Sequence, residues 1–182
     1  MFGTASTMRR RRNRCAAFPA NDSGATAVEF ALVAPPFLAL VIALIQTFLV
    51  FFAQQTLESI VRQSARLVMT GQVQSANMTK DVFKQKVCDQ ILILFNCSGL
   101  MVDMQVATSW TSADTAMPTL TYDGSGTVSN IWQYNPGVAG DIVVLRIMYE
   151  WPVVLGPLGF NLSNLSDGNR LIMSSAAFQN EP

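Results

Sequence analysis

The chain has 182 residues, of which half are hydrophobic and 13% are charged, and its formal net charge is zero. It has no histidine, which excludes His-based triads and histidine metal sites, and it carries no phosphate-binding glycine loop or nucleotide fingerprint. We therefore expect that the protein is not an enzyme and that it binds no metal, cofactor or small-molecule substrate. The charge is uneven, because residues 1–24 have a formal balance of +4 and the rest of −4, and no basic patch that would bind nucleic acid follows residue 24.

The first predicted element is a basic leader, residues 1–24. Its five arginines (Arg9, Arg10, Arg11, Arg12 and Arg14) stand among small and polar residues with no periodic apolar face. Asn21–Gly24 is a turn or breaker cluster, so we expect a helix to begin directly after it. A run of arginines can mark nucleic-acid binding or localisation, but beside a transmembrane segment an orientation signal is the better interpretation.

A transmembrane helix is predicted over residues 25–53. Phe30–Ala53 is 24 residues long and uncharged, whereas about 20 apolar residues cross a bilayer. The run is too long for a signal-peptide core of about 7 to 15 residues, and no small-residue cleavage pattern follows it. Because basic residues beside the first span stay in the cytoplasm, the chain after Ala53 is expected outside it.

Glu29 is the one charge in this helix. A carboxylate inside the hydrocarbon region is disfavoured by roughly 2.5 to 3.5 kcal/mol on insertion scales and is usually functional.

Together, Gly24-Ala-Thr-Ala-Val-Glu-Phe30 and Glu29-Phe-Ala-Leu-Val-Ala-Pro-Pro36, behind a basic leader, resemble the TadE-like pseudopilins or minor pilins of the tight-adherence (Flp) pilus. The ending, with Phe178, Asn180, Glu181 and Pro182, also resembles that family. The resemblance is strong over residues 23–52, moderate over 172–182 and weak between them.

The resemblance implies that a prepilin peptidase cuts after Gly24 and leaves Ala25 as the new N-terminus. Glu29 would then be the fifth residue, where the family carries a glutamate. The implied partners are the peptidase, other pilus subunits and the assembly platform of the bacterial inner membrane. The implied place is that membrane, crossed once, with the N-terminus cytoplasmic, the C-terminal domain periplasmic, and possible incorporation into a pilus.

Glu29 can pair with the α-ammonium group that cleavage would create at Ala25. Within one helix the two residues are four apart and share a face, and the helix dipole favours a carboxylate there. The carboxylate of one subunit can equally pair with the ammonium group of a neighbour. The alternative is that Glu29 only reaches the membrane interface.

Pro35 and Pro36 stand inside the predicted span. Each lacks an N–H and its ring clashes with the carbonyl group four residues back, so we expect a kink near Leu32–Val33. The kink can be a simple bend that orients the extracytoplasmic part, which we favour, or a locally melted helix that lets subunits slide during assembly.

Residues 54–74 are predicted to continue the helix beyond the membrane, to about Thr70, with Gly71 as its stop. An apolar stripe at helical spacing indicates a face packed on a sheet, and Glu58 with Arg62 forms a supporting i,i+4 pair. The stripe comprises Leu57, Ile60, Val61, Ser64, Leu67 and Val68.

Residues 75–182 are predicted to form an extracytoplasmic α+β domain. Thr79 can cap a second helix that runs to about Phe95. Alternation predicts a half-buried strand at Met101–Trp110 and a further strand at Ile142–Trp151. Arg170–Phe178 is predicted as the last of three antiparallel strands. Short strands are also possible at 120–122 and 127–132, and the carboxylates of Asp103 and Glu150 are assigned to ordinary solvated faces.

Cys88 and Cys97 lie on the side of the membrane where disulfides form, whereas Cys15 lies in the leader. A straight helix would separate the pair by about 13 Å, and a disulfide needs Cα atoms within about 7 Å. A bond therefore requires the helix to stop before Cys97 and the chain to double back. Unpaired buried cysteines are the alternative, and metal binding is disfavoured without histidine.

The function predicted from the sequence is that of a pseudopilin or minor pilin in assembly of a tight-adherence pilus. The alternative is a single-pass membrane protein with an extracytoplasmic binding domain whose leader is retained. A membrane-anchored enzyme is a distant third reading.

Overall fold

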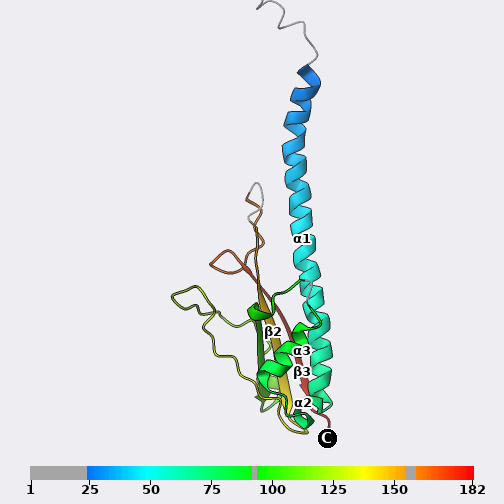
Figure 1. Cartoon of the computed structure of the whole chain (residues 1–182), viewed down its shortest axis with the longest axis vertical. Coiled ribbons are helices and arrows are strands. Elements are labelled where there is room, and N and C mark those ends of the chain that lie inside the picture. Colours follow the sequence, from blue (N-terminus) through cyan, green and yellow to red (C-terminus); the bar gives the residue numbers. More distant parts are fainter. Residues whose placement is uncertain (1–23, 92–93, 155–158) are drawn as a thin grey trace, which may run out of the picture. The chain divides into compact units, whose positions relative to one another are not determined.

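The computed structural model describes residues 24–91, 94–154 and 159–182. The leader arginines and Cys15 therefore lie outside the described residues. The elements (Figure 1) are α1 (Ala25–Met69), α2 (Gln72–Ser75), α3 (Lys80–Cys88), the short 3-10 helices η3 (Cys97–Gly99) and η4 (Trp110–Ser112), and the strands β1 (Leu100–Ala107), β2 (Ile142–Trp151) and β3 (Arg170–Gln179). The chain divides into two units, and the boundary falls inside α1, after Val41.

The second unit, Ile42–Pro182, contains a three-stranded antiparallel sheet in the order β1-β2-β3. Leu100 lies opposite Tyr149, and Ile142 lies opposite Gln179. The predicted α+β class and its three strands are confirmed, and β2 has the predicted bounds. β1 ends three residues earlier than predicted, because Trp110 belongs to η4 and Ser109 caps that turn.

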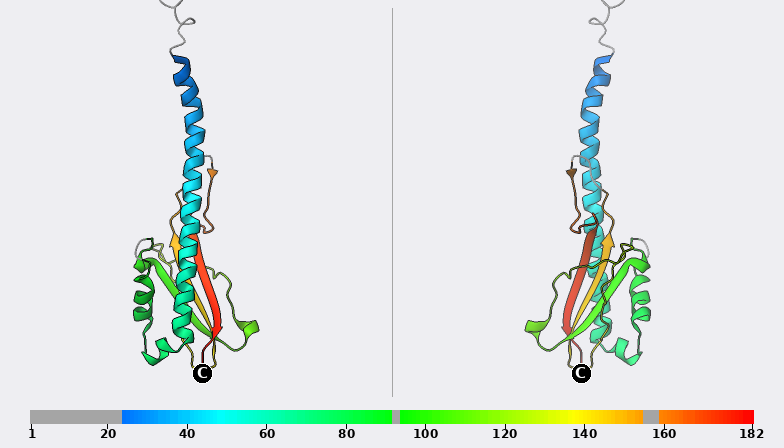
Figure 2. Two further views of the ribbon diagram at one scale, coloured as in Figure 1. Left: turned by 90° about the vertical axis from the view of Figure 1, so that its right-hand side faces the viewer. Right: turned by 90° about the vertical axis from the view of Figure 1, so that its left-hand side faces the viewer.

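The later part of α1 packs on one face of the sheet, and α3 covers the same face (Figure 2). The predicted apolar stripe is buried there, with Leu57 and Val68 fully inaccessible and Leu67 half-buried. Burial of each such aliphatic side chain contributes about 1.5 to 3 kcal/mol. This packing accounts for a helix that continues beyond its exposed apolar part.

α1 ends where the sequence predicted. Its last residue is Met69, and Gly71 adopts a left-handed φ of 73°. The N–H of Gly71 donates to the carbonyl oxygen of Val68 at 3.0 Å, which satisfies one terminal carbonyl group. A residue with a Cβ is disfavoured in this conformation, so glycine suits the position.

The second helix is shorter than predicted. Thr79 caps α3, its side chain accepting from the N–H of Val82, but the helix ends at Cys88 and not near Phe95. The predicted end was wrong because Ile91 and Phe95 turn into the core behind the helix end instead of extending its apolar face.

The other face of the sheet is covered by loop residues. Met101, Met148 and Leu171 are buried there against side chains from the segments that connect the strands. The predicted short strands at 120–122 and 127–132 are absent from the described residues, where only an isolated bridge joins Tyr122 to Val128. Leu100–Met104 of β1 and Val143–Met148 of β2 are therefore buried on both faces, whereas a half-buried strand was predicted for Met101–Trp110.

Candidate functional site

The predicted processing junction lies at the first residue of α1. The helix begins at Ala25, directly after Gly24. Gly24 does not have a positive φ, and a Cβ at this position would meet no atom of residues 24–91, 94–154 or 159–182 within 4 Å. Neither backbone conformation nor packing requires glycine here, in contrast to Gly71.

Glu29 lies one helical turn after Ala25, and its side chain is exposed. It is the only charged residue in α1 before Glu58. In the part of the chain that the structure describes, no basic side chain forms an ion pair with it. The geometry leaves this carboxylate available to a group outside the described residues.

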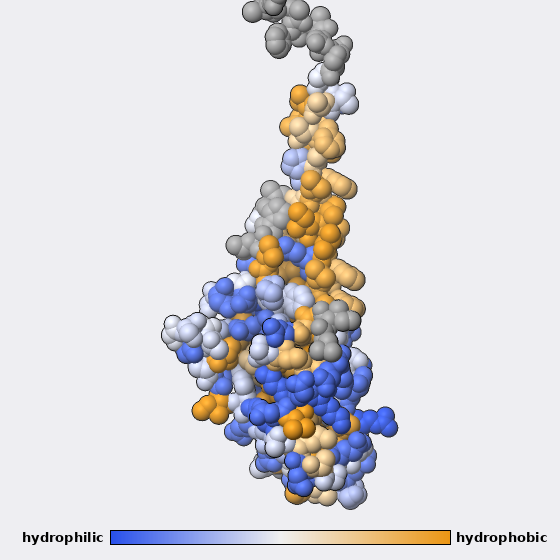
Figure 3. Space-filling view, viewed as in Figure 1, coloured by the Kyte–Doolittle hydropathy of each residue, from blue (hydrophilic) through white to orange (hydrophobic). Residues whose placement is uncertain are grey.

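α1 is the one helix, among the described residues, that is long and apolar enough to cross a membrane. Its most apolar window has a mean hydropathy of 2.4 and is 11% buried. Apolar side chains cover this helix in Figure 3. Those exposed include Val28, Phe30, Leu32, Val33, Phe37, Leu38, Leu40, Ile42, Leu44, Ile45, Phe48, Phe51 and Phe52. A core helix of a soluble protein would bury such residues, so this surface matches a single-pass anchor.

Pro35 and Pro36 lie within the helical span of α1, and both are exposed. The helix continues on both sides of the two prolines. The predicted kink near Leu32–Val33 stays a prediction.

Cys88 and Cys97 form the disulfide that the sequence favoured. Their Cα atoms are 5.6 Å apart, because α3 ends at Cys88 and the chain doubles back into η3. The bond closes a short loop that holds Phe95 in the core beside Tyr149, with ring centroids 4.9 Å apart. A loop of this size contributes about 2 to 3 kcal/mol.

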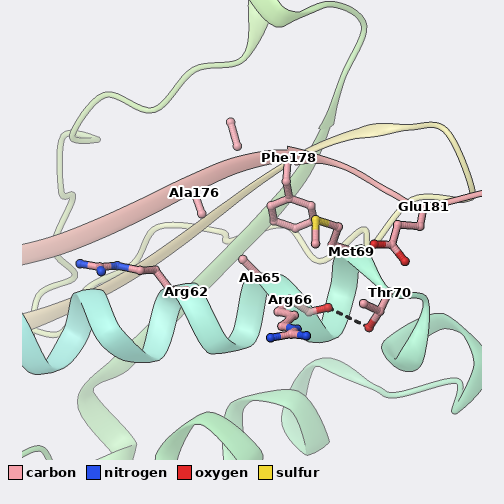
Figure 4. Close-up of a pocket in the computed structure, with 9 residues that line it drawn as sticks. Arg62, Ala65, Arg66, Met69, Thr70, Ala176, Phe178 and Glu181 are labelled. Carbon is pink, nitrogen blue, oxygen red and sulfur yellow. Dashed lines mark hydrogen bonds between the residues drawn. The ribbon is translucent and has the colours of Figure 1, made fainter.

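The family-like ending has a structural position that the sequence did not reveal. Phe178 packs in the core between helix and sheet, while the amide group of Asn180 is buried and donates to the carbonyl oxygens of Pro136 and Val138, at 2.9 and 3.1 Å. The N–H of Glu181 donates to the carbonyl oxygen of Met69 at 2.9 Å. Figure 4 shows Phe178 beside the end of α1. The ending therefore ties β3 to the loop before β2 and to the end of α1, and Pro182 is exposed.

Replacing Asn180 by alanine is expected to destabilise the chain by about 2 kcal/mol. The change removes two donors and leaves the carbonyl groups of Pro136 and Val138 without these bonds, and a buried unsatisfied group costs about 1 to 3 kcal/mol. Urea unfolding of the full chain in detergent, followed by tryptophan fluorescence, measures the change. Gln63→Ala, an exposed change on α1, is the control, and equal stability of the two variants would contradict the role of Asn180.

A buried ion pair joins β1 and β2 on the face opposite α1. Arg146 donates to one oxygen of Asp103 through Nη2 and Nε, at 2.6 and 3.0 Å, and Asp103 is 1% exposed. The other oxygen of Asp103 accepts from the N–H of Gln133 at 2.8 Å. Arg146 also reaches the carbonyl oxygen of Ala116 and the carboxylate of Asp114. The pair therefore fastens the loop after β1 onto the sheet.

The predicted assignment of Asp103 to a solvated face was wrong. The register places it directly opposite Arg146, and the overlying loop excludes water from both. Glu150 is instead half-buried and accepts from the hydroxyl group of Tyr122 at 2.6 Å. Asp103 is the one charged residue of β1 and Arg146 is the one basic residue of β2, and these opposite charges were the signal that could have revealed the pair.

Several ionisable side chains outside the apolar helix have shifted pKa values, and each shift has a structural cause. Burial lowers the pKa of Lys84, whose ammonium group donates to the carbonyl oxygen of Ser98. Burial, followed by the bond to Glu150, raises the pKa of Tyr122. Hydrogen bonds, first from Ser125, lower the pKa of Asp123.

Among the described residues, no three metal-ligating side chains gather into a group.

Comparison with known families gives one match. A family model described as TadE-like protein matches residues 24–66. The match begins at Gly24 and extends to the last turn of α1, so it confirms the resemblance over that segment and supports involvement in a function related to the Tad pilus. No curated protein and no solved structure matches the chain.

Proposed function

We propose that this TadE-like chain is a pseudopilin or minor pilin that takes part in assembly of a tight-adherence pilus after a prepilin peptidase removes residues 1–24. The observation that carries the proposal is the position of the TadE-like match. The match starts at Gly24, one residue before α1, and Glu29 is the fifth residue of that exposed apolar helix. An enzymatic role is not part of the proposal.

The position of Gly24 supports the processing step. A peptidase must bring the scissile peptide bond close to its catalytic groups, and a residue without a side chain permits the closest approach. Nothing around Gly24 in the described structure needs glycine for folding. A requirement for glycine here would therefore come from recognition by the peptidase.

The proposed location is the bacterial inner membrane, with the leader in the cytoplasm and the sheet domain in the periplasm. The five leader arginines support this orientation, because basic residues beside a span stay in the cytoplasm. The Cys88–Cys97 disulfide supports it independently, because such bonds persist in the oxidising periplasm. The proposed partners are the peptidase, other pilus subunits and the assembly platform.

Intact-mass analysis of the protein from cells with and without the prepilin peptidase tests the proposal. We expect the mature chain to begin at Ala25 when the peptidase is present and the leader to be retained when it is absent. A chain that begins at Met1 in peptidase-competent cells would show a membrane protein that keeps its leader and would overturn the proposal.

We further propose that Glu29 pairs with the α-ammonium group of Ala25, in its own helix or in a neighbouring subunit. Glu29→Gln keeps the shape and removes the charge, so it is expected to reduce entry into the pilus assembly by about tenfold or more, equivalent to about 1.4 kcal/mol. Quantitative immunoblotting of purified assemblies measures the effect, with Glu58→Gln, a change in the exposed pair with Arg62, as the control. Normal entry of the Glu29→Gln variant would defeat the pairing.

A further inference from the structure

The two edge strands of the sheet, β1 and β3, are covered to different extents by other segments of the chain. At the β1 edge, the N–H of Met104 donates to the carbonyl oxygen of Gln133, and the carbonyl oxygen of Met104 accepts from Asn135, so a loop segment covers part of that edge. β3 is the opposite edge. The backbone N–H and C=O groups that point outward from β3 are therefore the ones whose hydrogen-bond partners must be identified.

Hydrogen bonds in the first half of β3 reveal which residues point outward. Asn164 bonds to both the N–H and the carbonyl oxygen of Leu171, and the side chain of Gln54 donates to the carbonyl oxygen of Met173. Along a strand of an antiparallel sheet, the backbone N–H and C=O groups of successive residues point alternately toward one neighbouring strand and toward the other. Ser175, Ala177 and Gln179 therefore direct both backbone groups away from β2.

These three outward residues form an open edge, defined as Ser175, Ala177 and Gln179. Across the described residues, no backbone bond from another segment reaches their outward groups. Ala177 and Gln179 are exposed. The stretch also lacks the lysine or proline with which edge strands are commonly protected.

A groove runs beside the open edge, between β3 and the last turns of α1 (Figure 4). Its volume is about 430 Å³, and its floor includes Ala65, Met69 and Phe178. Arg62 and Arg66 extend from its helix side, while Glu181 is the one acidic residue that lines it.

The arginines complement an acidic strand. The side chain of Arg62 is 74% exposed, and Arg66, which is also exposed, has no acidic partner among the described residues. The two are separated by about 6 Å along the helix, and alternate residues of a strand are separated by about 6.6 Å. Acidic side chains at alternate positions of an added strand would therefore meet both arginines.

We propose that the open edge of β3 accepts an extended segment of a different polypeptide as a fourth strand, with acidic residues at alternate positions bound by Arg62 and Arg66. Main-chain hydrogen bonds would provide affinity and the groove would select the side chains, as in other cases of strand addition. This proposal goes beyond assembly of a pilus and does not depend on cleavage after Gly24.

A second copy of this chain does not fit the edge. Contacts of Gln54 with Met173 and of Met69 with Glu181 show that α1 and β3 run in the same direction. Antiparallel pairing of two β3 strands would invert one copy, so the apolar residues 42–53 of the two copies would lie at opposite ends and could not enter one bilayer from the same side. The arginines of the two copies would also add like charge at the interface.

The test uses the full chain in detergent micelles and the blocked heptapeptide Thr-Val-Glu-Val-Glu-Val-Thr as the probe. We expect saturable binding, with slower hydrogen exchange at the amides of Ser175 and Ala177. The peptide with lysine in place of both glutamates is expected to bind at least about tenfold more weakly, and alternate N-methylation of the acidic peptide is expected to abolish binding.

Arg66→Glu is the matched variant, because the residue is exposed and its change leaves the core intact. It is expected to reverse the preference toward the lysine peptide while the far-ultraviolet circular dichroism stays unchanged. Absence of binding, equal binding of both peptides, or tolerance of N-methylation would overturn the proposal. Protection of the same amides without peptide, rising with protein concentration, would assign the edge to a second copy and would also overturn it.

Discussion

Gly24→Gln is expected to leave the protein folded and its leader attached. A Cβ at residue 24 would meet no atom of the described residues within 4 Å, so we expect stability not to change, whereas a cleavage site that fits glycine closely would exclude the side chain. We expect cleavage at least about a hundredfold slower, equivalent to about 2.7 kcal/mol of lost transition-state stabilisation. Pulse-labelling in peptidase-competent cells, followed by gel mobility and intact mass, measures the rate.

Gly71→Ala provides the opposite control. Gly71 has a φ of 73°, so a Cβ there is expected to cost roughly 1 to 2 kcal/mol of stability while cleavage proceeds normally. The two glycines thus separate recognition from folding. Normal cleavage of Gly24→Gln would show that glycine is not what the peptidase requires, and slow cleavage of Gly71→Ala would show that stability limits processing.

Asp103→Ala is expected to destabilise the chain by about 3 to 5 kcal/mol. The change leaves the guanidinium group of Arg146 buried without its main partner, and an uncompensated buried charge is costly. Urea unfolding of the full chain in detergent measures the loss. Because Asp103 also accepts a hydrogen bond from the N–H of Gln133, the amides of the loop after β1 should exchange hydrogen faster in the same variant.

Two further variants identify the cause. Replacing both members of the pair, Asp103→Leu with Arg146→Met, removes the charge together with its partner and is expected to recover most of the loss. Glu58→Ala breaks only the exposed pair with Arg62 and is expected to change stability by less than about 0.5 kcal/mol. A double variant as unstable as Asp103→Ala would show that the loop contacts, rather than the buried charge, determine the cost.

The central elements were predictable because their signals are local. An uncharged apolar run identifies the membrane helix, a stripe at helical spacing identifies its continuation, and alternation identifies the strands. The end of α3 was not predictable, because Ile91 and Phe95 continue the apolar pattern although the chain has already turned. Periodicity reports which residues are buried, but it does not report which element buries them.

The sequence by itself determined the candidate processing junction, the lone carboxylate at Glu29 and the apolar helix, since these depend on residue order along one segment. The tertiary structure decided what depends on pairing. Register brought Asp103 opposite Arg146, and the end of α1 brought the N–H of Glu181 to Met69. Strand order left β3 at an edge beside two arginines. Such features arise when segments distant in the chain meet, so no local pattern encodes them.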